Sequence, residues 1–310
     1  MIVSALVAVA LSASLGQAAD PQPTATQVSS APAQRSTPLS RDSRGRPTIM
    51  ARFNGKGPYP MVLDTAAQTS LVTEGLAQEI ALPGLGQQMN VAGASGQAQA
   101  ELYGVDRFST DLFDAEGVAV LGLPNADATE AHGIVGMEMF ADSSIVFDPK
   151  AQTISVKPSG VPPEGFTAVK GRLDDNGLLI VPVEIDGVTF DALVDTGAAV
   201  SVASGGAPKA LGWAADDPRL KPAGTITGAS RDETAVQSGR VSRIRLGPVN
   251  FRNLDIIVLS EAQPVGSTPS SQKPQLILGS DLLNTLDAFA IDFPHAELLI
   301  RVPPHAAVPG

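Results

Sequence analysis

Two aspartates with matching neighbours stand out along the chain. Asp64 lies in the stretch MVLDTAAQTSLV and Asp195 lies in ALVDTGAAVSVA. Each follows an apolar run typical of a buried strand and precedes turn-forming residues. A buried carboxylate needs a partner, because an unpaired buried charge is costly. Two carboxylates within hydrogen-bond range share one proton, and such a pair can activate water by general acid–base catalysis.

The stretches around the two aspartates belong to a longer internal repeat. Three further blocks recur in the same order: VAGASG (91–96) with ITGASR (226–231), GIVGMEMF (133–140) with LILGSDLL (276–283), and more loosely VFDPKAQ (146–152) with IDFPHAE (291–297). The chain is therefore predicted to hold two copies of one lobe. Copies that pack about a pseudo-two-fold axis would bring Asp64 and Asp195 face to face.

Short runs of alternating apolar and polar residues, separated by Gly, Pro and Asn, predict a mainly β protein. Helical stretches are few and short, such as 74–80 and 280–286. The strands that we expect cover 48–53, 59–64, 117–123, 144–147, 153–156, 178–185, 189–195, 240–246, 254–259, 289–292 and 298–302.

In the order of these motifs the chain resembles the retropepsin-like aspartic proteases, in particular their exported bacterial members. In that family each lobe contributes hydrophobic-Asp-Thr-Gly-Ala, then a glycine-bearing flap, then hydrophobic-hydrophobic-Gly before a short helix. The resemblance covers about residues 46–303 and departs from the pattern at Ala66, where the family has glycine. It implies a mainly β, bilobal acid-protease fold, with two homologous β-barrel-like lobes related by pseudo-two-fold symmetry.

The same resemblance implies a role for each matching residue. Asp64 and Asp195 would be the catalytic pair, and Thr65 and Thr196 would bond across to the opposite lobe. Ala66 and Gly197 would complete the support of the pair. The expected flap and substrate-binding residues are Gly93, Ala94, Gly228 and Ala229. The activity implied is that of an aspartic endopeptidase, which hydrolyses an extended polypeptide without a metal or other cofactor.

Two alternatives stay open at the level of sequence. Ala66 adds a Cβ where the backbone should pass close to the carboxylates, so one alternative is a catalytically weak or inactive peptide-binding pseudoprotease. A protease active only as an intermolecular dimer through Asp195 is the other alternative. The residues after each motif, Ala67 and Ala198, stand where pepsin-like enzymes usually have a serine. Because that hydroxyl would stabilise the ionised pair, its absence predicts activity at mildly acidic to neutral pH.

The N-terminal apolar run ends in small residues, with Gly16 and Ala18 spaced for signal peptidase. This pattern predicts export to the bacterial periplasm or secretion, although no Lys or Arg precedes the run, so an uncleaved membrane anchor is an alternative. The division that we expect is a signal peptide (1–19), a disordered Pro/Ser-rich tether (20–46), an N-terminal lobe (47–157), a linker (158–171), a C-terminal lobe (172–303) and a tail (304–310).

The net charge and the lack of cysteine exclude several classes of partner and of site. A net charge of −11 argues against nucleic acid, because phosphate binding needs a basic face. The chain has no cysteine, which excludes disulfides and thiolate metal sites. The expected partner is a polypeptide substrate, for which a periplasmic segment of a membrane protein is one candidate. A monomer with pseudo-dimeric lobes is favoured over a homodimer.

Overall fold

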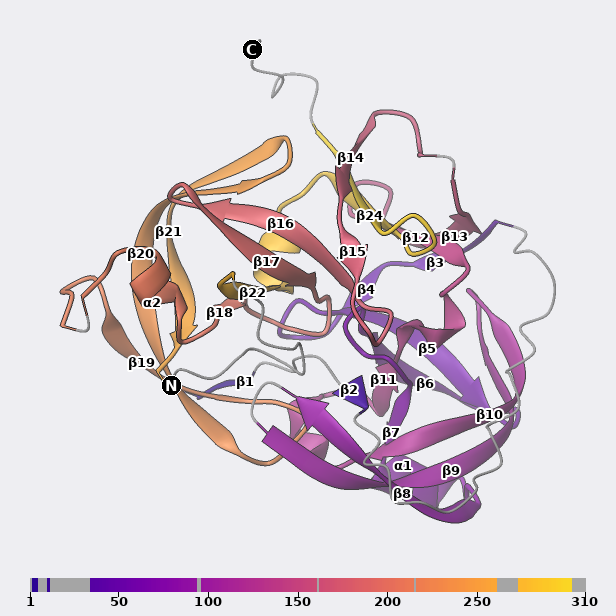
Figure 1. The fold of residues 1–310 in the computed structure, drawn as a ribbon. Coiled ribbons are helices and arrows are strands. Elements are labelled where there is room, and N and C mark those ends of the chain that lie inside the picture. Colours follow the sequence, from indigo (N-terminus) through magenta and orange to yellow (C-terminus); the bar gives the residue numbers. More distant parts are fainter. Residues whose placement is uncertain are drawn as a thin grey trace.

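The computed structural model describes residues 2–4, 10–11, 34–93, 96–160, 162–214, 216–260 and 273–302. These residues form two lobes and a sheet that joins them, with few and short helices (Figure 1). The mainly β, bilobal fold expected from the sequence is confirmed. Of the predicted segments, residues 1, 5–9 and 12–19 of the signal peptide, residues 20–33 of the tether and the tail 304–310 lie outside the described residues.

The N-terminal lobe is built on one sheet. Its elements are β2 (Ala10–Leu11), β4 (Ser40–Arg41), β5 (Pro47–Phe53), β6 (Lys56–Leu63), β7 (Leu71–Thr73), α1 (Glu74–Glu79), β8 (Gly84–Gly93), β9 (Gly96–Thr110), β10 (Asp114–Leu123), η1 (Ala126–Ala128), β11 (Gly133–Val135) and η2 (Met137–Met139). The strand order is β2-β8-β9-β10-β7-β11-β6-β5-β4. Because β9 also pairs with β5, the strands from β9 to β5 close into a barrel.

The C-terminal lobe has the corresponding sheet. Its elements are β1 (Ile2–Ser4), β15 (Arg172–Leu173), β16 (Leu179–Ile185), β17 (Val188–Val194), β18 (Val202–Ala203), α2 (Ala207–Ala210), β19 (Lys221–Thr227), β20 (Glu233–Leu246), β21 (Val249–Leu259), β22 (Gln275–Leu278) and α3 (Ser280–Leu283). The order β1-β19-β20-β21-β18-β22-β17-β16-β15, closed by pairing of β20 with β16, corresponds strand for strand to that of the N-terminal lobe.

A third sheet joins the lobes. It consists of β3 (Arg35–Pro38), β12 (Ser143–Asp148), β13 (Thr153–Pro158), β14 (Phe166–Lys170), β23 (Ala288–Asp292) and β24 (Glu297–Arg301). The order is β14-β24-β23-β12-β13-β3, so β12 of the first half pairs with β23 of the second at its centre. There the rings of Phe147 and Phe289 stack with centroids 4.6 Å apart. The two lobes therefore share one continuous apolar core and are not independent domains.

The prediction that the tether and the linker lack regular structure is partly wrong, because both contain strands. Residues 35–38 and 40–41 of the expected tether form β3 and β4, and residues 166–170 of the expected linker form β14. All three lie at sheet edges, where pairing needs only backbone N–H and C=O groups and little apolar surface. Arg46, at the end of the expected tether, is fully buried.

Helices play a small part in the described regions. The predicted helix 74–80 matches α1, whose first turn is capped by the Thr73 hydroxyl accepting from the Leu76 amide at 3.2 Å. The helix expected at 280–286 is shorter, because α3 ends at Leu283. No helix in the described parts of the chain is both long and apolar enough to cross a membrane.

Candidate active site

Asp64 and Asp195 occupy equivalent positions at the ends of buried strands. Asp64 follows β6 and its N–H donates to the Val135 carbonyl at 3.0 Å; Asp195 follows β17 and its N–H donates to the Leu278 carbonyl at the same distance. In both lobes the partner strand, β11 or β22, runs parallel to the strand that carries the aspartate. Both aspartates are fully buried. The sequence expectation of two carboxylates carried into the interior matches this placement.

Thr65 and Thr196 tie the two lobes together beneath the carboxylates. The Thr65 hydroxyl donates to the Val194 carbonyl at 2.8 Å and accepts from the Thr196 N–H at 3.0 Å. Reciprocally, the Thr196 hydroxyl donates to the Leu63 carbonyl at 2.6 Å and accepts from the Thr65 N–H at 3.1 Å. These four buried bonds fix the ends of β6 and β17 against each other. They lie within one chain, so a single copy brings both aspartates together.

The carboxylates are further held by backbone amides. The Ala66 N–H donates to Oδ1 of Asp64 and the Ala198 N–H donates to Oδ1 of Asp195, both at 2.8 Å. The backbone amide of Ala67, the counterpart of Ala198, also stabilises the Asp64 carboxylate. Each aspartate is thus held by the turn that follows its strand.

Gly197 is required by lack of space. A Cβ built on Gly197 would lie 2.7 Å from Oδ1 of Asp64, and closer still to its Oδ2 and Cγ. The backbone of Gly197 has no positive φ, so the requirement is steric. Ala66, at the equivalent position, is fully buried in an apolar cluster of the C-terminal lobe that includes Ile180 and Leu193. The methyl group of Ala66 is thus accommodated, and the site is asymmetric at this position.

The two carboxyl groups act on each other. Among the described residues, no N–H or hydroxyl group donates to Oδ2 of Asp64. The Asp195 carboxyl lies within hydrogen-bond range and lowers the pKa of Asp64. A contact between two carboxyls is a hydrogen bond only when one of them carries a proton. One proton shared between the two carboxyls would make this contact a hydrogen bond.

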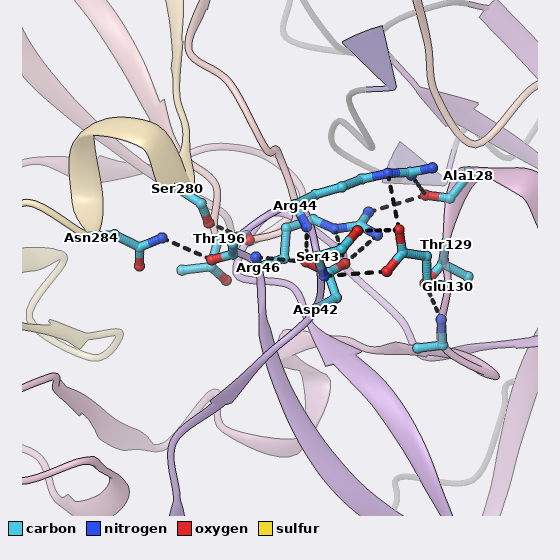
Figure 2. A network of polar contacts seen from close by, with 12 residues as sticks. Asp42, Ser43, Arg44, Arg46, Ala128, Thr129, Glu130, Thr196, Ser280 and Asn284 are labelled. Atoms are coloured by element: carbon cyan, nitrogen blue, oxygen red, sulfur yellow. Dashed lines mark hydrogen bonds and ion pairs between the residues drawn. The ribbon is translucent and has the colours of Figure 1, made fainter. Parts of the chain in front are cut away.

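Burial raises the pKa of Asp64 to about 6. The rise is opposed by the Ala66 N–H, by Asp195 and by the positive charge of Arg46. Arg46 is fully buried, with its Nε donating to Oδ2 of Asp42 at 2.7 Å and its Nη1 donating to the Ala128 carbonyl at 3.1 Å (Figure 2). Arg46 ends a Pro- and Ser-rich stretch whose composition gives no sign of a buried arginine, so its position could not be predicted from the sequence.

A second pair of acids supports the loops beneath the carboxylates. Oε1 of Glu138 accepts from the Ser70 N–H at 2.7 Å, and burial raises the pKa of Glu138 to about 7. The counterpart Asp281 accepts from the Ser201 hydroxyl at 2.7 Å, and burial raises its pKa too. Sequence reasoning missed both acids, although the repeated block places each of them two residues after a matching glycine, Gly136 or Gly279.

The expected flap residues lie in two hairpins that meet. Gly93 ends β8 and Gly96 begins β9, while Ala94 lies outside the described residues. Gly228 and Ala229 follow β19, and Ala229 is fully buried in an apolar cluster of the N-terminal lobe. A Cβ on Gly96 would collide with Asp232 of the other hairpin. The structure thus brings both hairpins together, with the C-terminal one docked on the opposite lobe.

Comparison with protein families agrees with this geometry. A family model described as Aspartyl protease matches the chain twice, over residues 49–139 and 181–282. Each match includes one of the two aspartates. A search of curated protein sequences found no match to the chain.

Proposed function

The chain belongs to the aspartyl protease family, and on that premise we propose that it is an endopeptidase in which Asp64 and Asp195 of one chain form a single catalytic pair. The observation that carries the proposal is the reciprocal bonding of Thr65 and Thr196, which joins the two carboxylate-bearing strand ends. Because these bonds lie within one chain, they favour the single-chain enzyme over the intermolecular dimer.

The chemistry follows from one shared proton. The ionised carboxyl takes a proton from a water molecule while the protonated carboxyl donates to the carbonyl oxygen of the scissile amide. The water oxygen bonds to the carbonyl carbon, and the resulting tetrahedral species collapses with cleavage of the C–N bond as the amine takes up a proton. The raised pKa of Asp64 keeps a proton in the pair at mildly acidic pH.

The substrate that we propose is an extended, largely apolar peptide segment. Support comes from the edges of β8 and β19, on which two short strands of the chain's own N-terminal segment already lie. β1 runs parallel to β19 and β2 antiparallel to β8 (Figure 1). An extended segment crossing a pseudo-two-fold axis has these opposite senses relative to equivalent strands, and such strand addition is a common mode of peptide recognition.

Apolar residues flank the pair on both sides, which supports apolar specificity. In the N-terminal lobe Ala67 belongs to a cluster with Leu71 and Val91; in the C-terminal lobe Ala198 belongs to one with Val202 and Ile226. These residues hold equivalent places in the two lobes, in the loop after each aspartate and in the adjacent flap strand. We therefore propose apolar side chains on both sides of the scissile bond.

Cleavage of an unfolded protein mixture between pH 4 and 8 tests the function. The enzymes compared are wild type, Asp64→Asn and Asp195→Asn, each with and without a statine-type transition-state mimic. Asp142→Asn is the matched control, because Asp142 is exposed and distant in sequence from the pair. Loss of inhibitor-sensitive cleavage in both site variants, with Asp142→Asn active, is the expected result. A silent Asp64→Asn would refute the single-chain pair.

The place of action is a separate proposal that rests on the N-terminal sequence. We propose that the protein is exported and trims an envelope-facing segment of a membrane protein, because the apolar run and the small residues after it fit a signal peptide. Fusion of residues 1–33 to a reporter that is active only outside the cytoplasm tests export. A reporter retained in the cytoplasm would refute the proposal of export.

A further inference from the structure

The tip of the C-terminal hairpin is held by one side chain of the opposite lobe. Nδ2 of Asn125 donates to the carbonyls of Gly228 and Ser230, at 3.1 Å in each case. An amide nitrogen carries two hydrogens, so both are used on this one hairpin. Asn125 is buried and lies between β10 and η1 of the N-terminal lobe. The contact therefore joins the lobes at the hairpin tip, away from the threonines beneath the carboxylates.

Apolar packing reinforces these bonds. Ala229, between the two accepting carbonyls, is fully buried in the cluster that includes Leu121, Leu123 and Ala128 of the N-terminal lobe. Ser230 is also buried, and Nε of Arg231 donates to the Pro124 carbonyl at 3.2 Å. The tip is thus docked by polar and apolar contacts to one short loop, residues 124–128.

That loop is itself fixed by the turn between β4 and β5 (Figure 2). Nη1 of Arg44 and Nη1 of Arg46 both donate to the Ala128 carbonyl, at 3.0 and 3.1 Å. The same segment reaches the C-terminal lobe, where Nδ2 of Asn284 donates to the Gly45 carbonyl at 2.8 Å. The loop that carries Asn125 is therefore braced by residues that contact both lobes.

We propose that Asn125 is a positioning residue that latches the C-terminal hairpin closed over the carboxylate pair. Both aspartates are fully buried with this hairpin docked and with β1 and β2 paired to β19 and β8, so a substrate reaches them only when these surrounding segments move. The latch sets how readily that happens and how firmly a bound peptide is enclosed. This inference rests on the proposed function for its effect on catalysis, but its effect on the hairpin is independent of catalysis.

Hydrogen exchange of the free protein tests the latch without reference to activity. Asn125→Ala removes both donors, and Asn125→Asp keeps the size of the side chain while placing an acceptor against two carbonyls. We expect exchange in residues 225–233 to rise about tenfold or more in both variants, from the loss of two hydrogen bonds. Exchange in residues 143–158 of the joining sheet should stay unchanged. Asn250→Ala, at an exposed residue of β21, is the matched control.

Kinetics supply the second measurement. Because the latch encloses the bound peptide, both variants should raise KM and the dissociation constant of a statine-type inhibitor about tenfold, with kcat unchanged or higher. Unchanged exchange at 225–233 in Asn125→Asp would overturn the inference, as would a uniform rise across the whole chain, which would mark a merely structural role. Faster local exchange in the two Asn125 variants, together with a wild-type protein that cleaves nothing, would support the latch and refute the proposed function.

Discussion

Gly197 lies directly against the Asp64 carboxyl, and its replacement by alanine tests the paired geometry. A Cβ essentially never approaches another heavy atom within 3.0 Å, and here it would lie 2.7 Å from Oδ1 and closer to Oδ2 and Cγ. The carboxyl must therefore withdraw by roughly 1 Å, and a displacement of that size at reacting groups costs about 100-fold in rate. Overpacking of the buried site costs about 1–3 kcal/mol of stability in addition.

The equivalent position in the other lobe provides the matched control. Ala66→Gly removes a methyl that packs in an apolar cluster, which costs about 0.8 kcal/mol for the methyl and about 0.5–1 kcal/mol for the added backbone freedom. Because that methyl is already accommodated in the cluster, kcat/KM should stay within a few-fold of wild type. The assay is kcat/KM on an apolar peptide near pH 5.5, with thermal unfolding of each variant to confirm folding.

Two results would refute this reasoning. A folded Gly197→Ala enzyme with more than a third of wild-type kcat/KM would show that the Asp64 carboxyl does not need its position against residue 197. Equal damage from Ala66→Gly and Gly197→Ala would show that the asymmetry between the lobes has no consequence for catalysis.

Three further predictions concern protonation and the contact between the lobes. Since burial raises the pKa of Asp64 to about 6, kcat/KM should fall about tenfold per pH unit above that value as the pair loses its proton; an optimum at pH 8 would contradict this. Glu138 has a pKa of about 7 in the folded state against 4.5 ordinarily, so the folded state binds more protons and stability falls as pH rises through that window. Glu138→Gln should therefore exceed wild type by up to about 3 kcal/mol at pH 8 and match it near pH 4 in denaturant unfolding. Thr65→Val removes one donor and leaves the buried Thr196 N–H unpaired, which should cost about 2–4 kcal/mol by the same assay, and an unchanged midpoint would refute it.

The part of the site that sequence predicted best is the part encoded locally. The apolar runs before Asp64 and Asp195 are short strands with a turn behind them, and their recurrence along the chain indicated the pairing. The helix at 74–80 likewise carries its own start signal in Thr73. These features depend on neighbouring residues alone, so they can be predicted from the sequence.

The features that were missed depend on partners far along the chain. Asn125 sits in a stretch with ordinary loop composition, and its acceptors lie 103 and 105 residues away. Strands β3 and β14 pair through backbone groups at sheet edges, so their side chains carry little of the strand pattern. Arg46 has the sequence context of a solvated tail, because its buried partners, the Asp42 carboxylate and the Ala128 carbonyl, are brought around it only by the fold.

The sheet that joins the lobes also dictates the order in which the molecule can be completed during synthesis. Its central strand β12 is almost entirely buried and pairs on one side with β13, which follows it at once. Its other neighbour, β23, begins only at Ala288. A nascent chain therefore carries an apolar, unpaired strand edge until β23 has been made.

Such an edge is a template for pairing with another chain. A chain truncated before β23 is expected to self-associate through Ser144–Phe147, with a second copy of β12 taking the place that β23 fills in the complete protein. Pairing with β23 thus protects β12 from self-association, and the chain lacks this protection between the synthesis of β12 and that of β23.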